Sequence, residues 1–578
     1  MGRMARGQYR DQARGRSRSF RDLGCKAFGI ASYSVAVLGL AGTPARAQAP
    51  EAPYFPGAAA TPGAFGLTPG ALTTAPGAYG APPPAAAVVE PPLAETPVEI
   101  PEVPPAWLLV PVITLGESFT DNTNLAPAGS RVWDLITTVG PELDLTGQTA
   151  RLNVALTYDP QELIFARSSP TTVLQQRLLG TGTAILWPEV LFFDANASIN
   201  QAFVHPTGPI GPTTLTTSNN LTTVYSANAS PYLRQHLGSY SDSETRYRFT
   251  TTSTDAGGIA PEDINELRQT FVSGEAFGRL GWQLTGDYTK LSRGHDPTDP
   301  FSGVSSKDEL GRADLSYPIY YSFSVIGGVG YERIVDPTLS SPPKGIIWDT
   351  GLRYQPNQLV AATLTYGQRF NTTDIEFNGT YNLDPQLSLS AIYTETIQTS
   401  LSQLAGTTNQ TVINPLTGLP VGTVTTSASG ISSGAFLSKT AELDAVLTKE
   451  RNTYSGKVYE TKTGGNSTTT VSSTTLAITS TASASAVTAE RITGAALTWD
   501  HKLWPDLTAT AGTSYYRARF GDGSGRVDNA YTLSLALAYT LSRTATANIT
   551  LSRSDLRSNI AVDSLVVDTV TATIRKQF

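Results

Sequence analysis

Histidine is the side chain most often used for proton transfer and metal binding near neutral pH, and this chain has four. His205, His236, His295 and His501 lie far apart, and none has a second His, a Cys or paired carboxylates at the spacing of a metal site. We therefore predict a protein that is not an enzyme, with no catalytic residue, no metal and no cofactor. A hydrolase site built from a nucleophile and a His on neighbouring strands stays open, because residues distant in sequence can meet in space.

The segments that would position these side chains alternate with a period of two residues. Residues 531–540 place Tyr and Leu on one face and Thr, Ser and Ala on the other, and residues 152–158 and 321–332 repeat the pattern. Such runs are about ten residues or longer, the length that a tilted strand needs to cross a bilayer. No apolar run reaches the roughly 18 residues of a membrane-spanning helix. The pattern predicts an all-β protein.

Composition narrows the class further. Charged residues make up 15% of the 578 residues, against ~25% in soluble domains, while hydrophobic residues make up 40%. The apolar share argues against a disordered chain. The net charge of the whole chain is −7, and the acidity of the part that remains after the predicted export signal is removed argues against nucleic acid as a partner.

The first 47 residues have the features of an export signal. Residues 1–26 are rich in Arg, residues 27–40 are apolar, and Ala45-Arg46-Ala47 is a small-x-small cleavage site. A single anchoring helix is the alternative, although the apolar stretch is short for one. Removal of residues 1–47 takes away nine basic and two acidic residues and lowers the net charge from −7 to −14.

Residues 48–106 form a second region, which holds 15 of the 38 Pro residues and a repeated Pro-Gly-Ala motif. Closely spaced Pro blocks helix and sheet and favours extended polyproline II. We predict a disordered tether in the periplasm. Two roles stay open for it: a passive spacer, or a docking strip for a cell-wall or periplasmic partner.

Connection lengths in the remaining region, residues 107–578, alternate between long polar loops and tight turns. Outer-membrane barrels show this asymmetry, with long loops outside and short periplasmic turns. The pattern predicts a transmembrane antiparallel up-and-down β-barrel of about 22 strands, within a range of 18–24, with both termini in the periplasm. One connection, at residues 371–373, is short where a long loop is expected. The predicted long loops are residues 120–131, 159–171, 204–221, 253–264, 295–307, 334–345, 400–432 and 465–487.

Aromatic residues support a membrane location for this barrel. Trp and Tyr prefer the headgroup zone of a bilayer, and we predict that Trp107, Trp187, Trp282 and Trp504 form a girdle at strand ends. Several predicted turns place an aromatic residue just before Pro, which suits a turn because Pro fixes φ and donates no hydrogen bond. The alternative is a large soluble sandwich with these rings packed inside.

The last residues alternate as a barrel strand would. Val570, Ala572 and Ile574 precede a terminal Phe578 at even spacing, which resembles the C-terminal signal read by the outer-membrane assembly machinery. Lys576 departs from that pattern, where an apolar residue is usual. We therefore expect barrel-assembly machinery and outer-membrane lipid as partners.

One strand carries charges on the face opposite its aromatic residues. Tyr247 and Phe249 would face lipid, so Glu244, Arg246 and Arg248 would face the lumen. Two roles are open for these three residues. They form a cross-strand ionic network that stiffens the barrel, or they line a path for an anionic or polyhydroxylated solute.

Three segments resemble the PEP-CTERM system-associated outer-membrane β-barrel family. They are Ser118 to Pro127, Pro231 to Arg234 together with Ser239 to Tyr247, and Tyr366-Gly367-Gln368-Arg369-Phe370, and the resemblance spans about residues 107–400. It implies a setting beside exosortase and exopolysaccharide genes, with exopolysaccharide or its export and sorting components as partners. It implies no chemistry, because the activity of that family is itself unassigned.

The function that these features favour is a porin-like or polymer-export channel in the outer membrane. The alternative is a sealed structural barrel that presents Thr-rich loops as a binding surface. A TonB-dependent receptor is a third class, disfavoured because the 59 residues between signal and first strand are too Pro-rich for a plug domain. We predict that residues 400–432 and 465–487 fold inward or cap the lumen. The solute and the oligomeric state stay open.

Overall fold

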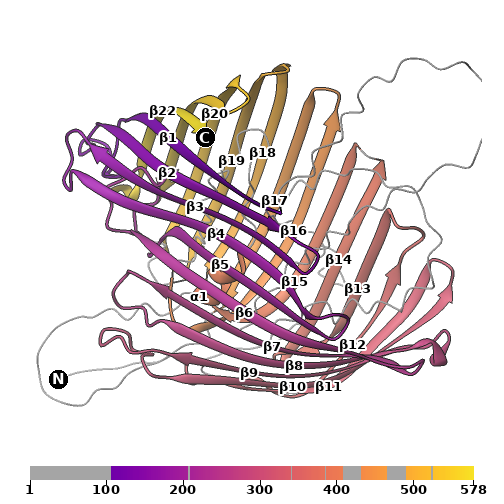
Figure 1. Cartoon of the computed structure of the whole chain (residues 1–578). Coiled ribbons are helices and arrows are strands. Elements are labelled where there is room, and N and C mark those ends of the chain that lie inside the picture. Colours follow the sequence, from indigo (N-terminus) through magenta and orange to yellow (C-terminus); the bar gives the residue numbers. More distant parts are fainter. Residues whose placement is uncertain are drawn as a thin grey trace, which may run out of the picture.

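The computed structural model contains one closed antiparallel barrel (Figure 1). It describes residues 106–205, 208–211, 213–339, 341–384, 386–407, 431–464, 490–521 and 525–578, so the predicted signal and nearly all of the predicted tether lie outside it. The strands are β1 (Trp107–Thr120), β2 (Asp134–Gln148), β3 (Leu152–Phe165), β4 (Thr172–Trp187), β5 (Leu191–Phe203), β6 (Leu221–Leu237), β7 (Ser241–Thr254), β8 (Glu262–Ser273), β9 (Gly281–Arg293), β10 (Ser305–Tyr320), β11 (Phe323–Val335), β12 (Lys344–Tyr354), β13 (Val360–Arg369), β14 (Thr372–Asp384), β15 (Leu387–Thr399), β16 (Ala435–Lys449), β17 (Asn452–Gly464), β18 (Glu490–Trp504), β19 (Leu507–Phe520), β20 (Val527–Ser542), β21 (Ala545–Ser558) and β22 (Leu565–Gln577).

Each strand pairs with its neighbours in sequence, and the first pairs with the last. β1 runs antiparallel to β22, from Val112 opposite Gln577 to Thr120 opposite Thr569. This pairing removes both edges of the 22-stranded sheet, so the backbone groups of the strands have partners without water. The predicted all-β barrel of about 22 strands is confirmed.

Side chains alternate between an outward and an inward face along each strand. On β20, Tyr531, Leu533 and Leu535 are exposed on the outward face, while Thr532 and Ser534 between them are less exposed and point inward. Exposed Leu, Val, Ile, Tyr and Trp recur on the outward face of most strands. An apolar surface of this extent is stable against hydrocarbon rather than against water.

The two rims of the barrel differ in their connections. At the turn end, where β1 begins and β22 ends, most connections have two or three residues; at the loop end, most have six or more. The β13–β14 connection at the loop end has only Phe370 and Asn371, both with positive φ, as the tight turn of a two-residue hairpin requires.

The predicted loop at residues 159–171 is too long, because β3 continues to Phe165. Asp159 and Gln161 turn toward the lumen, so polar residues here follow the strand pattern rather than mark a loop. Pro160 lies where the register between β2 and β3 is interrupted, opposite a stretch that contains Pro141. Neither Pro can donate a ladder hydrogen bond, which accounts for the gap.

In the described residues, helical structure is short. One α-helix, α1 (Ser400–Thr407), follows β15, and single 3₁₀ turns occur at Glu275–Phe277 and Ala561–Asp563. Among the described residues, no helix has the length and apolarity required to cross a bilayer. In Figure 1, α1 lies within the ring of strands rather than outside it.

Candidate functional site: the lumen and its loop-end mouth

Inward-facing charged side chains form a cross-strand ladder on β5 to β9. Arg246 donates to Glu244 on its own strand at 2.9 Å and to Asp194 on β5 at 3.0 Å, and its guanidinium lies 3.8 Å from the ring centre of Tyr232. Arg248 donates to Glu266 on β8 at 3.0 Å, and both side chains are buried. Glu244, Arg246 and Arg248 therefore lie together in an ionic network on the lumen side.

Two more groups of paired charges lie farther around the wall. Arg268 on β8 contacts Glu266 at 3.1 Å and Asp287 on β9 at 2.7 Å. On β10, Arg312 donates to Asp314 at 2.7 Å and also pairs with Asp349 of β12. Desolvated guanidinium groups are stable only when carboxylates complete their hydrogen bonding. The lumen wall supplies these carboxylates itself.

A further pair bridges the seam where the barrel closes. Arg575 on β22 makes two hydrogen bonds to Glu142 on β2, at 3.0 and 2.7 Å, and so crosses over β1. Ser118 on β1 and Thr571 on β22 add a hydroxyl contact of 3.0 Å across the same seam. These contacts fasten the first strand between the last and the second.

Helix α1 crosses the loop-end mouth of the lumen. It follows β15, yet Leu401 and Leu404 pack against Ala202 of β5 and Val224 of β6 on a distant part of the wall. The amide of Ile431, where the described chain resumes, donates to the carbonyl of Val204 just beyond β5, at 2.8 Å. The two described parts of the connection between β15 and β16, residues 400–407 and 431–434, therefore lie against the inner wall of the barrel.

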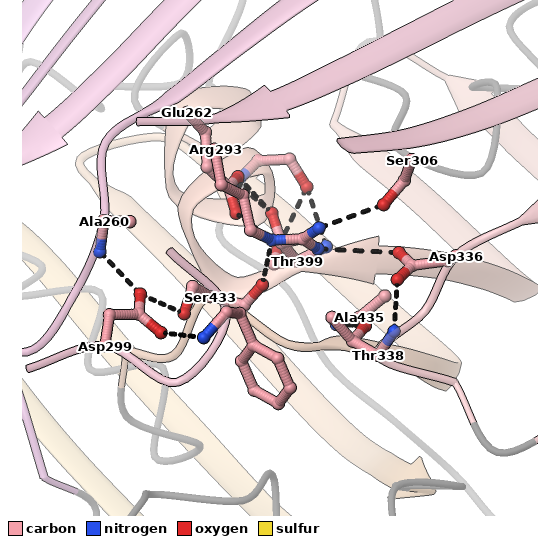
Figure 2. A network of polar contacts seen from close by, with 12 residues as sticks. Ala260, Glu262, Arg293, Asp299, Ser306, Asp336, Thr338, Thr399, Ser433 and Ala435 are labelled. Carbon is pink, nitrogen blue, oxygen red and sulfur yellow. Dashed lines mark hydrogen bonds and ion pairs between the residues drawn. The ribbon is translucent and has the colours of Figure 1, made fainter. Parts of the chain in front are cut away.

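A buried polar network fastens this connection to the wall (Figure 2). Arg293, at the loop end of β9, donates to the carbonyl oxygen of Ser433 at 2.6 Å and to the hydroxyl of Ser306 at 2.9 Å. Its guanidinium also faces the carboxylates of Glu262 at 3.8 Å and Asp336 at 3.5 Å. The Arg293 side chain is fully buried, so one cation joins the β8, β9, β10 and β11 ends to the residues before β16.

Two more contacts hold the same connection. At its start, the Thr399 hydroxyl donates to Glu262 at 2.5 Å. Near its end, the Ser433 hydroxyl donates to Asp299 at 2.5 Å, and Asp299 also accepts the amide of Ala260 at 2.7 Å. We call the group of Glu262, Arg293, Asp299, Asp336, Thr399 and Ser433 the mouth latch. It ties both ends of the β15–β16 connection to the loop ends of β8 and β9 and to the connections that follow β9 and β11.

The loops beside the mouth latch are tied to each other as well. Asp296, in the β9–β10 connection, accepts hydrogen bonds from the hydroxyl and amide of Thr298 and from the amide of Gly258 in the β7–β8 connection. These bonds, those of Thr298 first, hold the pKa of Asp296 below its usual value. A carboxylate at this position therefore stays charged and keeps the two loops together.

Exposure of the inward face increases from the mouth toward the turn end. Along β6, Thr222 and Val224 are buried, Asn228 is partly exposed, and Arg234 and His236 are exposed. Along β4, Gln175 is buried whereas Thr183 is exposed. The described loops thus fill the lumen at one end and leave polar side chains accessible at the other.

The histidines stay separate in the structure. His236 contacts Asp242 at 2.6 Å, His501 contacts Asn452 at 2.8 Å, and His295 lies 3.4 Å from the Ser302 hydroxyl. Within the described ranges, no three His, Cys, Asp or Glu residues are arranged to hold a metal.

The predicted girdle residues lie at one rim. Trp107 begins β1, Trp187 ends β4 and Trp504 ends β18, and all three are exposed at the turn end. Trp282, near the start of β9, is partly buried because its ring meets that of Phe277 edge-on at 5.3 Å.

The residues of the predicted C-terminal signal share one face of β22. Val570, Ala572, Ile574 and Phe578 are exposed on the outward face, next to β1. Lys576, the residue that departs from the apolar pattern, lies on the same face. Its ammonium group donates a hydrogen bond to the Thr544 hydroxyl at the rim, at 2.5 Å.

Sequence reasoning missed the mouth latch. Glu262 and Arg293 stand at inward positions of their strands, which the alternating pattern could have indicated. Asp336 and Ser433 lie in connections, and nothing in the sequence indicates that these connections approach one another.

Comparison with protein families gives a match at the C-terminal end of the chain. Residues 448–578 match the family described as "Putative beta-barrel porin 2", which corresponds to strands β17 to β22 and the end of β16. The protein is an outer-membrane β-barrel. A search of curated proteins gave no match.

Solved structures of similar architecture include siderophore receptors and an iron transporter. The FrpB iron transporter of Neisseria meningitidis has a TM-score of 0.47 and 9% identity, with 82% of each chain covered. The siderophore receptor PirA of Acinetobacter baumannii has a TM-score of 0.45 and 9% identity, with 81% of this chain and 80% of the receptor covered. A mutant of the ferric enterobactin receptor PfeA of Pseudomonas aeruginosa has a TM-score of 0.45 and 10% identity, with the same coverage.

Proposed function

We propose that this barrel is a porin-like channel for small polar solutes, narrowed at its loop end by the β15–β16 connection. The observation that carries the proposal is the polar inward face, which is accessible toward the turn end and is covered at the loop end, where α1 and the mouth latch cross the lumen. A barrel of this strand number encloses a lumen wider than its own wall side chains can fill. The match of residues 448–578 to a porin family supports the same function.

The orientation follows from the same asymmetry. Outer-membrane barrels carry their long loops outside and their short turns in the periplasm. We therefore place the loop end at the cell surface and both ends of the barrel chain in the periplasm. The predicted tether would then extend into the periplasm.

Of the two roles open for Glu244, Arg246 and Arg248, the ionic ladder favours a structural role over the binding of anionic solutes. Each guanidinium in that ladder already has carboxylate partners, so little positive potential remains for a solute. Small neutral polar solutes, such as sugars, fit a wall of Thr, Ser, Asn and paired charges better than anions do.

A sealed structural barrel is the second candidate function. The apolar contacts of Leu401 and Leu404 at the mouth favour it, because they close the lumen without charged groups that a solute could displace. The link to an exosortase and exopolysaccharide system remains a prediction from the resemblance of residues 107–400.

Liposome swelling separates the two candidates. Proteoliposomes that contain the purified barrel should swell in isosmotic small sugars, more slowly than those with an open porin of similar strand number. Swelling at the rate of protein-free liposomes would favour the sealed barrel.

A further inference from the structure

A row of cations faces outward at the loop ends of β17, β18 and β19. Lys462 is the register partner of Arg491, and Arg491 is the register partner of Arg519. Opposite residues of an antiparallel pair have Cα atoms about 4.5–5.5 Å apart, and like charges in that position repel. All three residues are exposed.

The alternation of each strand places these cations on the lipid side. Arg491 shares its face of β18 with Leu497 and Trp499, which are exposed outward. On β19, Arg517 and Arg519 alternate with Ala518 and Phe520, which are buried in a cluster on the opposite face.

Aromatic residues fix the depth of the row in the membrane. Tyr515 of β19 and Tyr531 of β20 are register partners with ring centres 4.9 Å apart, on the outward face. Arg517 is the next residue of β19 on the outward face, two positions nearer the loop end than Tyr515. It lies opposite Asn529 of β20, which in turn lies opposite Arg557 of β21. Tyrosine belts mark the boundary between hydrocarbon and headgroups, so the cations that follow lie at the level of the headgroups.

Carboxylates compensate only part of this charge. We call the six outward residues Lys462, Arg491, Arg517, Arg519, Arg553 and Arg557 the outer cationic patch. Glu460 contacts both Lys462 and Arg491 at 2.6 Å.

Two other carboxylates form ion pairs with the residues of the outer cationic patch that lie on β21. Asp568 pairs with Arg553 at 2.9 Å, and Asp555 pairs with Arg557 at 2.6 Å. In the described part of the chain, Arg517 and Arg519 have no carboxylate partner.

We propose that the outer cationic patch binds the phosphate groups of a lipid in the leaflet at the loop end. Phosphate oxygens would separate the opposed cations and accept hydrogen bonds from Arg517 and Arg519. The acyl chains of the same molecule would cover the apolar outward face below, where Leu497 and Leu533 are exposed. A soluble anion would satisfy the cations but not this continuous apolar surface, so a lipid fits both. The proposal does not depend on whether the lumen conducts.

Lipid retention by the purified full-length barrel tests the proposal. The probe is lipid A with its two phosphates, added to protein in neutral detergent, and bound lipid is counted by native mass spectrometry. Arg517→Gln with Arg519→Gln should lower the bound fraction at least about tenfold, the scale of two lost phosphate contacts. The matched control, Lys449→Gln with Arg451→Gln, removes the same charge from the end of β16 and the turn that follows it, at the opposite rim, and should retain lipid A as the wild type does.

Several results would overturn the proposal. Equal retention by the patch variant and the control variant would remove the site. Equal retention of dephosphorylated lipid A by the wild type would show that acyl chains alone bind. Displacement of lipid A by millimolar inorganic phosphate would indicate a simple anion site. Because Arg517 and Arg519 are exposed, both variants should keep the gel migration of the folded barrel, and the wild-type comparisons need no variant.

Discussion

Pairs of arginines that lie opposite each other on neighbouring strands have many carboxylate partners on the lumen face of the barrel and few on its outward face. In the lumen, Arg246 and Arg268 are register partners, yet Glu244, Asp194, Glu266 and Asp287 contact them. On the outward face, Arg491 and Arg519 are also register partners, and among the described residues the carboxylate that contacts them is Glu460, which pairs with Arg491. The protein therefore neutralises the arginines of its lumen with its own carboxylates. It leaves part of the positive charge at the headgroup level to be neutralised by a bound lipid. In this barrel, the arginines with carboxylate partners stabilise the wall, and those with few carboxylate partners form the proposed lipid-binding surface.

The mouth latch should give the largest effect, because its cation is fully buried between two carboxylates. Arg293→Met removes that cation and leaves Glu262 and Asp336 buried without the positive charge that faces them both. We expect a loss of about 3–5 kcal/mol in the free energy of unfolding, measured by urea titration in lipid vesicles. Arg333→Met is the control, since its pair with Glu309 is long and exposed, and should cost no more than about 1 kcal/mol. Equal losses in the two variants would contradict a special role for the mouth latch.

The lumen ladder can be tested by removing one partner or both. Arg248→Met alone should cost about 3 kcal/mol, because it leaves Glu266 buried with less compensation, whereas Arg248→Met with Glu266→Leu should recover much of the loss. Both variants are compared in the same vesicle unfolding assay. A double variant no more stable than the single one would show that the pair does more than neutralise its own charge.

A carboxylate placed in the outer cationic patch sharpens the comparison. Arg519→Glu puts an acid opposite Arg491 and should stabilise the barrel by about 0.5 kcal/mol in neutral detergent, where no lipid phosphate is present. Arg268→Glu, the equivalent change in the lumen, should destabilise it. If thermal unfolding shows both changes to be destabilising, the outer cations are not in repulsion.

The smallest effect is expected at the exposed pair of Arg553 and Asp568. Both side chains are more than two-fifths exposed, so water screens the pair. Arg553→Gln should change the free energy of unfolding by less than about 0.5 kcal/mol. A loss above about 1 kcal/mol in the same assay would place this residue with the buried ladder.

Most of the fold could be predicted from the alternating pattern, because every strand that crosses a membrane needs an apolar face toward lipid. Alternation in residues such as Tyr531 to Tyr539, together with loop lengths, was sufficient for the strand count and for the position of most turns. It failed at residues 159–165, where lumen-facing Asp and Gln look like loop residues. Polar inward positions and polar loops have the same composition, and only the closed ring separates them.

The site was predicted in part. Glu244, Arg246 and Arg248 could be assigned to the lumen face from their spacing, because each alternates with an aromatic or Thr residue. Their carboxylate partners, such as Asp194 and Glu266, depend on register between strands, which one sequence does not reveal. The mouth latch depends on loops that meet across the lumen, and local pattern carries no signal for that contact.

Single-channel conductance tests the central claim most directly. The claim is that the β15–β16 connection narrows a polar lumen at its loop end. A variant in which a short Gly-Ser linker replaces residues 402–431 should give larger conductance steps in planar bilayers than the wild type, while it keeps the gel migration of the folded barrel. Conductance identical to that of the wild type, from a barrel shown to be folded and inserted, would contradict the claim.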